Sequence, residues 1–204
     1  MTASDRIVIR PATLRELSWV AAFMRPADRR EVFALGPDDN PLALAARLDA
    51  MPGEAHAACR DGVPVAVFGA APNGPGVVEV WMFATPDWPG VAAAVTRYIL
   101  CRMLPGLAAA GIRRAQCLSI EGHIEAHRWL ERLGAVREGT HPGRGRDGET
   151  FITYAWRRGD PLVERRIAAP ACHPFQPDEK GAIPHVCRTL QPARPAAAPA
   201  AADL

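Results

Sequence analysis

The residue best suited to acid–base chemistry in this 204-residue sequence is a glutamate within an apolar run. Residues 77–84 have the alternation expected of a β-strand, which puts Glu79 and Trp81 on the same face. A carboxylate beside an indole ring is expected to have a raised pKa, and a raised pKa suits a general base near neutral pH. The alternative interpretation is a glutamate on the strand surface that pairs with an arginine.

His123 and His127 lie four residues apart on one face of a predicted helix, a spacing at which two histidines can share a metal ion. The order H-I-E-A-H differs from the H-E-x-x-H motif of zinc proteases, and no third ligand is evident. Other metal-ligand types lie near the C-terminus, at Cys172, His173, His185 and Cys187. Because their spacing matches no familiar zinc module, we predict no metal site. His123 is instead expected to face solvent at the start of its helix.

The composition indicates a soluble globular protein, with 49% hydrophobic and 23% charged residues. The formal net charge is +2 and the basic residues are scattered, which argues against a nucleic-acid partner. No run is apolar and long enough for a membrane span, and the N-terminus does not resemble a signal peptide. Five thinly spread cysteines suit a reducing compartment, so a cytoplasmic location is expected.

The sequence pattern predicts alternating groups of strands and helices. Thr13 and Glu16 have the spacing of a capping box. Asp61-Gly62 and Asn73-Gly74 are turn signals between strands. A helix capped by Asp39 or Asn40 is expected to bury Leu42, Leu44, Ala45 and Leu48. The other predicted elements are helices from Thr13, at 26–35, 91–109 and 123–133, and strands at 7–9, 55–60, 63–69, 77–84, 115–120, 135–138 and 150–156.

This order predicts an α/β (α+β) fold with a mixed, mostly antiparallel central sheet and helices on both faces, formed by residues 1–157. After Arg157, proline recurs and the chain ends in Ala/Pro repeats. Such a segment buries too little apolar surface to offset the entropy of ordering it. Residues 158–204 are therefore predicted to be a disordered tail or a docking arm.

The element order and two local motifs resemble the GCN5-related N-acetyltransferase (GNAT) superfamily over roughly residues 6–157. In that family the fourth strand leads into a signature close to P-x-x-R-G-x-G-x-G/A at the start of the next helix. The corresponding residues read P-D-W-P-G-V-A-A-A, where Pro86, Gly90 and Ala94 match. Pro89 stands at the arginine position and Ala92 at a glycine position.

The second motif of the family, N-x-x-A-x-x-x-Y-x-x-x-G-F, corresponds to H-I-E-A-H-R-W-L-E-R-L-G-A at residues 123–135. Leu130 replaces the tyrosine that usually acts as the acid, and leucine has no proton to donate. For an active enzyme, the resemblance implies Glu79 as the base. Ser119 and His123 are the candidates that would replace the acid.

The resemblance also implies acetyl-CoA as the cosubstrate of an active enzyme. Its pantetheine arm would pair with a splayed fourth strand near Phe83 and Thr85. Its pyrophosphate would be bound by backbone N–H groups at the helix start, those of Gly90, Val91, Ala92, Ala93 and Ala94. Pro89 lacks an N–H and Ala92 adds a methyl group, and each change is expected to cost about 1–3 kcal/mol of binding.

Three segments resemble, more narrowly, a degenerate acetyltransferase-like family of small tailed-phage proteins that is related to an internal virion protein of short-tailed phages. They are M-R-P-A-D-R-R-E-V from Met24, E-V-W-M-F-A-T from Glu79 and H-R-W-L-E-R-L-G-A from His127.

Together with the missing Arg, Gly and Tyr, this resemblance favours a phage virion or virion-assembly component. Its partners would be other virion or assembly proteins, bound through the C-terminal tail in the host cytoplasm or the virion. The alternative is an active acetyl-CoA-dependent N-acetyltransferase that acts on an amine of a small molecule or protein.

Overall fold

The structure, a computed structural model of the chain, describes residues 6–168. A seven-stranded sheet has the order β1-β2-β3-β4-β5-β7-β6, and every neighbouring pair is antiparallel except β4 and β5. The mixed, mostly antiparallel sheet predicted from the sequence is therefore confirmed. The strands are β1 (Ile7–Pro11), β2 (Glu54–Arg60), β3 (Val63–Pro72), β4 (Val77–Ala84), β5 (Arg114–Ile120), β6 (Val136–His141) and β7 (Phe151–Arg157).

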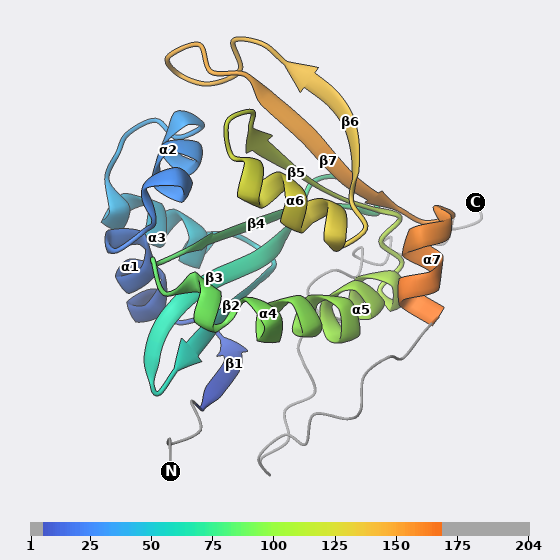
Figure 1. The fold of residues 1–204 in the computed structure, drawn as a ribbon, viewed down its shortest axis with the longest axis horizontal. Helices are drawn as coiled ribbons and strands as arrows, with labels where there is room; N and C mark the ends of the chain where they lie inside the picture. The colour runs from blue at the N-terminus through green and yellow to red at the C-terminus, as the bar shows by residue number, and fades with distance from the viewer. Residues whose placement is uncertain (1–5, 169–204) are drawn as a thin grey trace, which may run out of the picture.

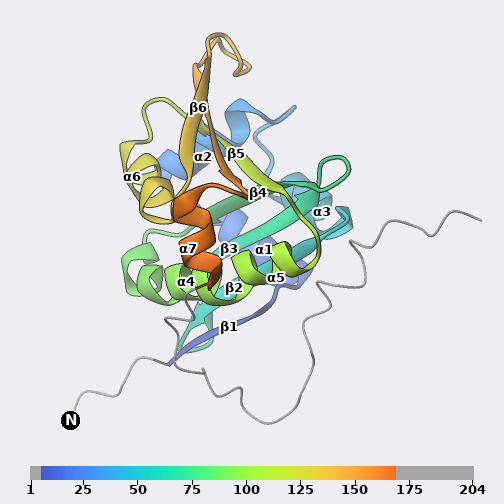
Figure 2. The same cartoon turned by 90° about the vertical axis from the view of Figure 1, so that its right-hand side faces the viewer.

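Helices cover both faces of this sheet (Figures 1 and 2). On one face, α1 (Leu14–Ala22) and α3 (Pro41–Ala50) pack on Val67 and Phe83, with α2 (Pro26–Ala34) beside them. On the other face, Phe68 and Val78 belong to a second buried cluster. The helical segments that contribute to this second cluster are α4 (Ala92–Tyr98), η2 (Ile99–Met103), α5 (Leu104–Ala109), α6 (Ile124–Arg132) and α7 (Pro161–Ala168).

Local signals in the sequence set the ends of several elements. The N–H of Thr13 donates to the Glu16 carboxylate at 2.8 Å, as the predicted capping box requires. Asn40 is the cap of α3, since its side chain accepts from two N–H groups of the first turn. Asp61 and Gly62 have φ values of 50° and 82°, which a tight hairpin turn needs. The predicted burial of Leu42 is wrong, because this residue is 64% exposed.

The long helix predicted at 91–109 is interrupted. A π-helical turn, η2, separates α4 from α5 and ends directly before Leu104 and Pro105. Proline lacks the N–H that an α-helix would use at this position, and its ring crowds the preceding turn. The π turn therefore lies where the regular α-helical hydrogen bonds are interrupted by Pro105. The proline is the physical reason for the break between α4 and α5.

The chain continues as a helix beyond the predicted domain end at Arg157. Helix α7 begins at Pro161 and packs on α5 and η2, with Val163 buried in the core of the domain. The sequence pattern did not predict this helix. The remainder of the predicted tail, from residue 169, lies outside the described residues.

The two parallel strands at the centre of the sheet diverge. β4 and β5 pair only at three positions, from Val77 opposite Arg114 to Glu79 opposite Gln116. β4 then continues to Ala84, and β5 to Ile120, without pairing to one another. The splayed fourth strand expected from the GNAT resemblance is therefore present.

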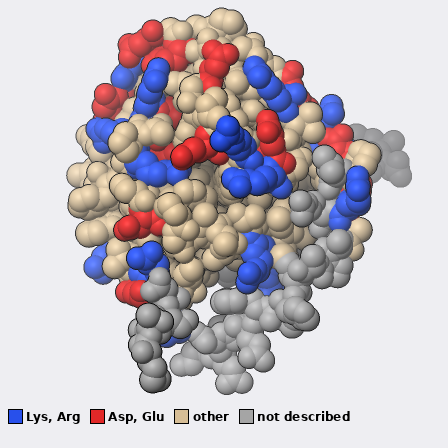
Figure 3. Space-filling view, viewed as in Figure 1, with Lys and Arg blue, Asp and Glu red and all other residues tan. Residues whose placement is uncertain are grey.

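The surface carries both signs of charge. Acidic and basic side chains are interspersed on the face shown in Figure 3. Within residues 6–168, none of the helices has the length and apolar character that crossing a bilayer would need.

Candidate functional site

The edge of β4 that faces the gap between the splayed strands is partly occupied by the chain itself. The carbonyl of Ala84 accepts from the N–H of Arg25 at 2.8 Å, and the N–H of Ala84 donates to Asp28 at 2.7 Å. Backbone groups alternate in direction along a strand, so those of Val80 and Met82 face the gap as well.

Phe83 and Thr85 have the opposite orientation. The N–H of Thr85 donates to Val65 at 2.8 Å, and Phe83 lies opposite Val67, so their backbone groups point toward β3. The side chain of Phe83 is buried among α1 and α3. The backbone groups of Phe83 and Thr85 therefore face β3, and those of Val80 and Met82 face the gap between the splayed strands.

Helix α2 joins the ends of both diverging strands through two carboxylates one turn apart. Asp28 accepts from Ala84 of β4 and also receives two hydrogen bonds from Arg25, at 2.7 and 3.0 Å. Glu31 accepts from the hydroxyl of Ser119 at 2.7 Å and from the N–H of Ile120 at 2.8 Å. The acidic residues of α2 thus satisfy backbone donors that the splay leaves without a strand partner.

His123 completes this group from the start of α6. Its Nδ1 lies 3.2 Å from Glu31, its Nε2 lies 3.6 Å from Asp28, and the residue is 6% exposed. The prediction that His123 faces solvent is wrong, because α2 covers the position where α6 begins. We name Arg25, Asp28, Glu31, Ser119 and His123 the α2 cluster.

The surroundings change the proton affinities within the α2 cluster. Burial opposes the charged form of His123, but the hydrogen bond to Glu31 and the carboxylates of Glu31 and Asp28 outweigh it, so the pKa of His123 is raised above 6.5. Burial also raises the pKa of Asp28, although Arg25 and the N–H of Ala84 act in the opposite direction. The cluster is therefore an arrangement in which a buried imidazole is favoured as a cation.

A cavity of about 280 Å³ lies between the splayed strands and reaches the α2 cluster. Much of its wall is apolar, with Met82, Leu118 and Leu130 among the contributors. Its charged, hydroxyl and imidazole side chains are those of Arg25, Asp28, Glu31, Glu79, Ser119, His123 and Glu125. The fold therefore brings the three predicted catalytic residues, Glu79, Ser119 and His123, to the wall of one cavity.

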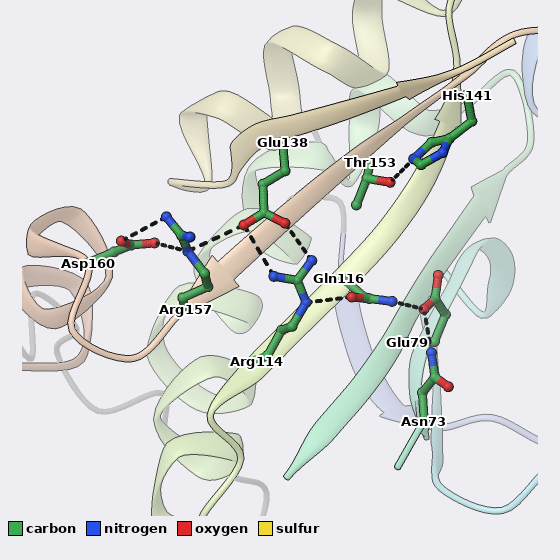
Figure 4. A network of polar contacts seen from close by, with 9 residues as sticks. All are labelled: Asn73, Glu79, Arg114, Gln116, Glu138, His141, Thr153, Arg157 and Asp160. Atoms are coloured by element: carbon green, nitrogen blue, oxygen red, sulfur yellow. Dashed lines mark hydrogen bonds and ion pairs between the residues drawn. The ribbon is translucent and has the colours of Figure 1, made fainter. Parts of the chain in front are cut away.

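Glu79 is held at the other side of this cavity by a polar network (Figure 4). Its carboxylate accepts from Gln116 at 3.1 Å and from Asn73 at 3.2 Å. Gln116 in turn accepts from Arg114, which pairs with Glu138. The predicted alternative, a glutamate paired with an arginine on the strand surface, is thus realised only indirectly, with Gln116 between the two charged groups.

The loop that would hold a pyrophosphate uses two of its N–H groups internally. The turn η1 (Trp88–Gly90) directs the N–H of Gly90 to Asp87 at 2.9 Å and that of Val91 to Trp88 at 3.0 Å. Only Ala92, Ala93 and Ala94 of the predicted set remain as donors, since the first N–H groups of a helix have no partner within it. The guanidinium of Arg60 lies against Gly90, so this loop has a positive charge nearby although Pro89 replaces the arginine.

Nothing in the described part of the chain groups three or more metal-ligating side chains. His127 is buried and its Nε2 donates to the carbonyl of Ile120 at 3.0 Å, whereas His123 faces Glu31. The two histidines therefore have separate partners. The four Cys and His residues considered near the C-terminus lie outside the described residues.

Sequence reasoning did not single out Arg25, Asp28 and Glu31 as site residues. A signal was available, because Asp28 and Glu31 are three apart in a helix predicted from Pro26, which places both carboxylates on one face. Their contact with Ser119 and His123 joins parts of the chain that are far apart in sequence, since 88 positions separate Glu31 from Ser119. No local pattern predicts such a contact.

Solved structures similar to this chain include acetyltransferases. An N-acetyltransferase from Staphylococcus aureus has a TM-score of 0.60 at 12% identity, covering 74% of this chain and 98% of its own. A ribosomal-protein-alanine N-acetyltransferase from Brucella melitensis has a TM-score of 0.58 at 16% identity, covering 74% and 99%. A GNAT-family acetyltransferase from Streptococcus pneumoniae has a TM-score of 0.55 at 14% identity, covering 76% and 100%.

No protein-family model matches the chain, and no curated protein matches it. The similarity to the solved structures establishes that the chain has the GNAT acetyltransferase fold.

Proposed function

We propose that this protein is a component of a tailed-phage virion, or of virion assembly, that has the GNAT fold without using acyl-CoA. The observation that carries the proposal is that groups needed for acyl-CoA are bonded within the chain. Both backbone groups of Ala84 are taken by α2, and the N–H groups of Gly90 and Val91 are taken by η1. Each lost donor is expected to weaken ligand binding by about 1–3 kcal/mol.

The positions of the phage-like segments support the same proposal. The segment from Met24 supplies Asp28 and Glu31, the segment from Glu79 supplies Val80 and Met82, and the segment from His127 supplies Trp129 and Leu130. All three segments line the one cavity. Segments that each contribute to the wall of a single cavity are expected if related proteins share that feature.

The partners in this proposal are other virion or assembly proteins, and the location is the host cytoplasm or the virion. Because α7 packs on the domain through Val163, the segment proposed to contact partners is the chain after Ala168. Mass spectrometry of particles purified from the phage that encodes the chain tests this. Copies of the protein at constant stoichiometry in particles or assembly intermediates are expected, and absence from both rules the proposal out.

The second candidate is an acyl-CoA-dependent N-acyltransferase, favoured by the splay and by the cavity between β4 and β5. The cosubstrate would supply an activated acyl group. The backbone of Val80 and Met82 and the N–H groups of Ala92 to Ala94 are the groups that would hold it. Glu79 would accept the proton of the acceptor amine, and His123 or Ser119 would donate one to the leaving thiolate. Both side chains already contact the same oxygen of Glu31, Ser119 at 2.7 Å and His123 at 3.2 Å.

Calorimetric titration with acetyl-CoA separates the two candidates. The virion proposal predicts a dissociation constant for acetyl-CoA of about millimolar or weaker, which is a binding free energy near −4 kcal/mol. A functional acyl-CoA site would have a dissociation constant of about micromolar, near −8 kcal/mol. A Pro89→Arg, Ala92→Gly double variant restores the family signature and serves as the matched control. It is expected to bind weakly as well, because Ala84 stays bonded to Asp28. Micromolar binding by the unmodified chain, with thiol release, would favour the enzyme.

A further inference from the structure

His56 of β2 is a buried imidazole that takes no part in the proposed function. It is 6% exposed, and its Nδ1 makes no hydrogen bond to any of residues 6–168. Its ring stacks on Phe68 of β3, with centroids 5.5 Å apart, and lies 5.1 Å from the ring of Tyr98, the last residue of α4. Phe68 and Tyr98 also meet edge to face at 5.8 Å. These three rings join the sheet to the end of α4, and we name them the His56 stack.

The surroundings of His56 favour its uncharged form. Its cross-strand partners are Pro11 on β1 and an aromatic ring on β3, and both are uncharged. Among the described residues, the ionisable groups that face the stack are Glu54 on β2, Tyr98 and Arg102 on η2. Glu54 and Arg102 act on the phenol of Tyr98 in opposite directions. Burial lowers the pKa of His56 to about 4, so the imidazole is neutral at pH 7.

An imidazolium cannot be accommodated in this stack without cost. Its second N–H would lack an acceptor, because Nδ1 already has none among the described residues. Burial raises the pKa of Glu54, so this carboxylate loses its charge as the pH falls and compensates a nearby cation less. A protonated His56 is therefore stabilised only by water, which it reaches when the rings separate.

The stack adjoins an irregular part of the helix. Tyr98 directly precedes the π-helical turn η2, where the α-helical hydrogen bonds are interrupted. Ile99 and Met103 of η2 line the cavity between β4 and β5, as does Phe68 of the stack. A movement of Tyr98 away from the sheet would therefore displace one wall of this cavity.

We infer that the His56 stack is a proton-sensitive latch, which holds α4 and η2 on the sheet while His56 is neutral and releases them, opening the cavity wall, when His56 is protonated. The released imidazole binds protons more tightly than the stacked one. The closed arrangement therefore loses stability as the pH falls from about 6.5 to about 4. The inference requires neither acyl-CoA nor a virion partner, so it holds or fails separately from the proposed function.

Hydrogen exchange of the full chain tests the latch through the amides of residues 92–103, after correction for intrinsic exchange rates. Between about pH 7.5 and about pH 4.5, their opening constant is expected to rise about 80-fold, from the difference between the released and stacked pKa of His56. His56→Phe keeps an aromatic ring that cannot be protonated and is expected to lose most of this rise. Tyr98→Phe keeps both His56 and the ring contact, and it is expected to retain the rise.

The amides of β7 distinguish release of the helix from unfolding of the domain. Unchanged protection of β7 at the lower pH supports the latch, whereas loss of protection in β7 together with α4 overturns it. No rise in the unmodified chain, or an equal rise in His56→Phe, also overturns it. If His56→Phe does not fold, NMR titration of the unmodified chain decides the question. A shared midpoint for the imidazole of His56 and the ring of Tyr98 supports the latch, and separate midpoints overturn it.

Discussion

The α2 cluster and the polar network of Glu79, Gln116, Arg114, Glu138 and Arg157, which we name the open network, use the same residue types in different surroundings. In the α2 cluster, the side chain of Asp28 is 3% exposed and it binds Arg25 and a backbone N–H. In the open network, Glu138 and Arg114 pair with side chains 21% and 27% exposed (Figure 4). Solvent screens the attraction between Glu138 and Arg114. The buried carboxylate of Asp28 is instead hydrogen-bonded by donors of the protein in place of water.

This difference indicates what each group does for the fold. The α2 cluster satisfies strand ends that the splay leaves without a neighbour and forms part of a cavity wall. The open network crosses β4, β5, β6 and β7 through Glu79, Gln116, Arg114, Glu138 and Arg157, and it reinforces pairs that the ladders already fix. Changes in the first are therefore expected to cost more than changes in the second.

The largest effect is expected from Asp28→Ala. This change leaves the guanidinium of Arg25 and the N–H of Ala84 without their acceptor, at a cost of about 3–5 kcal/mol in the free energy of unfolding. Glu138→Ala, the matched control, is expected to cost about 0–1 kcal/mol. Urea titration of both variants provides the measurement. Equal losses in the two would contradict the distinction between the regions.

A smaller loss is expected from Glu31→Gln. The amide keeps an acceptor oxygen for Ser119 and Ile120 but removes the charge beside His123, at a cost of about 1–3 kcal/mol. The pKa of His123 is expected to fall, because the hydrogen bond and charge that raise it are weakened. NMR titration of the imidazole follows the shift. An unchanged His123 pKa would show that Glu31 does not set it.

The pH dependence of stability sharpens the comparison further. The pKa of His123 is raised in the folded state, so its stabilising contribution is fully present below the unfolded pKa of about 6.5 and is lost as pH rises through the folded pKa. The stability difference between the unmodified chain and His123→Gln should therefore be largest below about pH 6.5 and shrink as the pH rises through the raised folded-state pKa of His123. A difference that grows as the pH rises would refute the assigned contacts.

The smallest effect is expected in the open network. Arg114→Ala is expected to cost about 1 kcal/mol or less, because its partner Glu138 keeps Arg157 and solvent. Added salt should reduce this cost, since exposed ion pairs are screened. Urea midpoints at low and high ionic strength measure it. A cost that is large and independent of salt would place this network with the buried cluster.

Much of the architecture was predictable because its causes are local in sequence. The strand at 77–84 follows from alternation, the first helix from its capping box, and the hairpin from Asp61-Gly62. The interruption before Pro105 and the helix α7 were missed. The interruption has a local cause in Pro105, whereas α7 depends on how Val163 packs against the rest of the domain, which outweighs propensity.

The amino-acid sequence by itself determined the order of the elements and the chemical types on offer, including the carboxylate of Glu79 and the imidazole of His123. Only the tertiary structure decided that His123 is buried and that Glu31 meets Ser119 across 88 positions of the chain. The physical reason is that the splay leaves backbone donors unpaired at Ala84 and Ile120. The helix that satisfies them is chosen by packing in three dimensions, which no local pattern records.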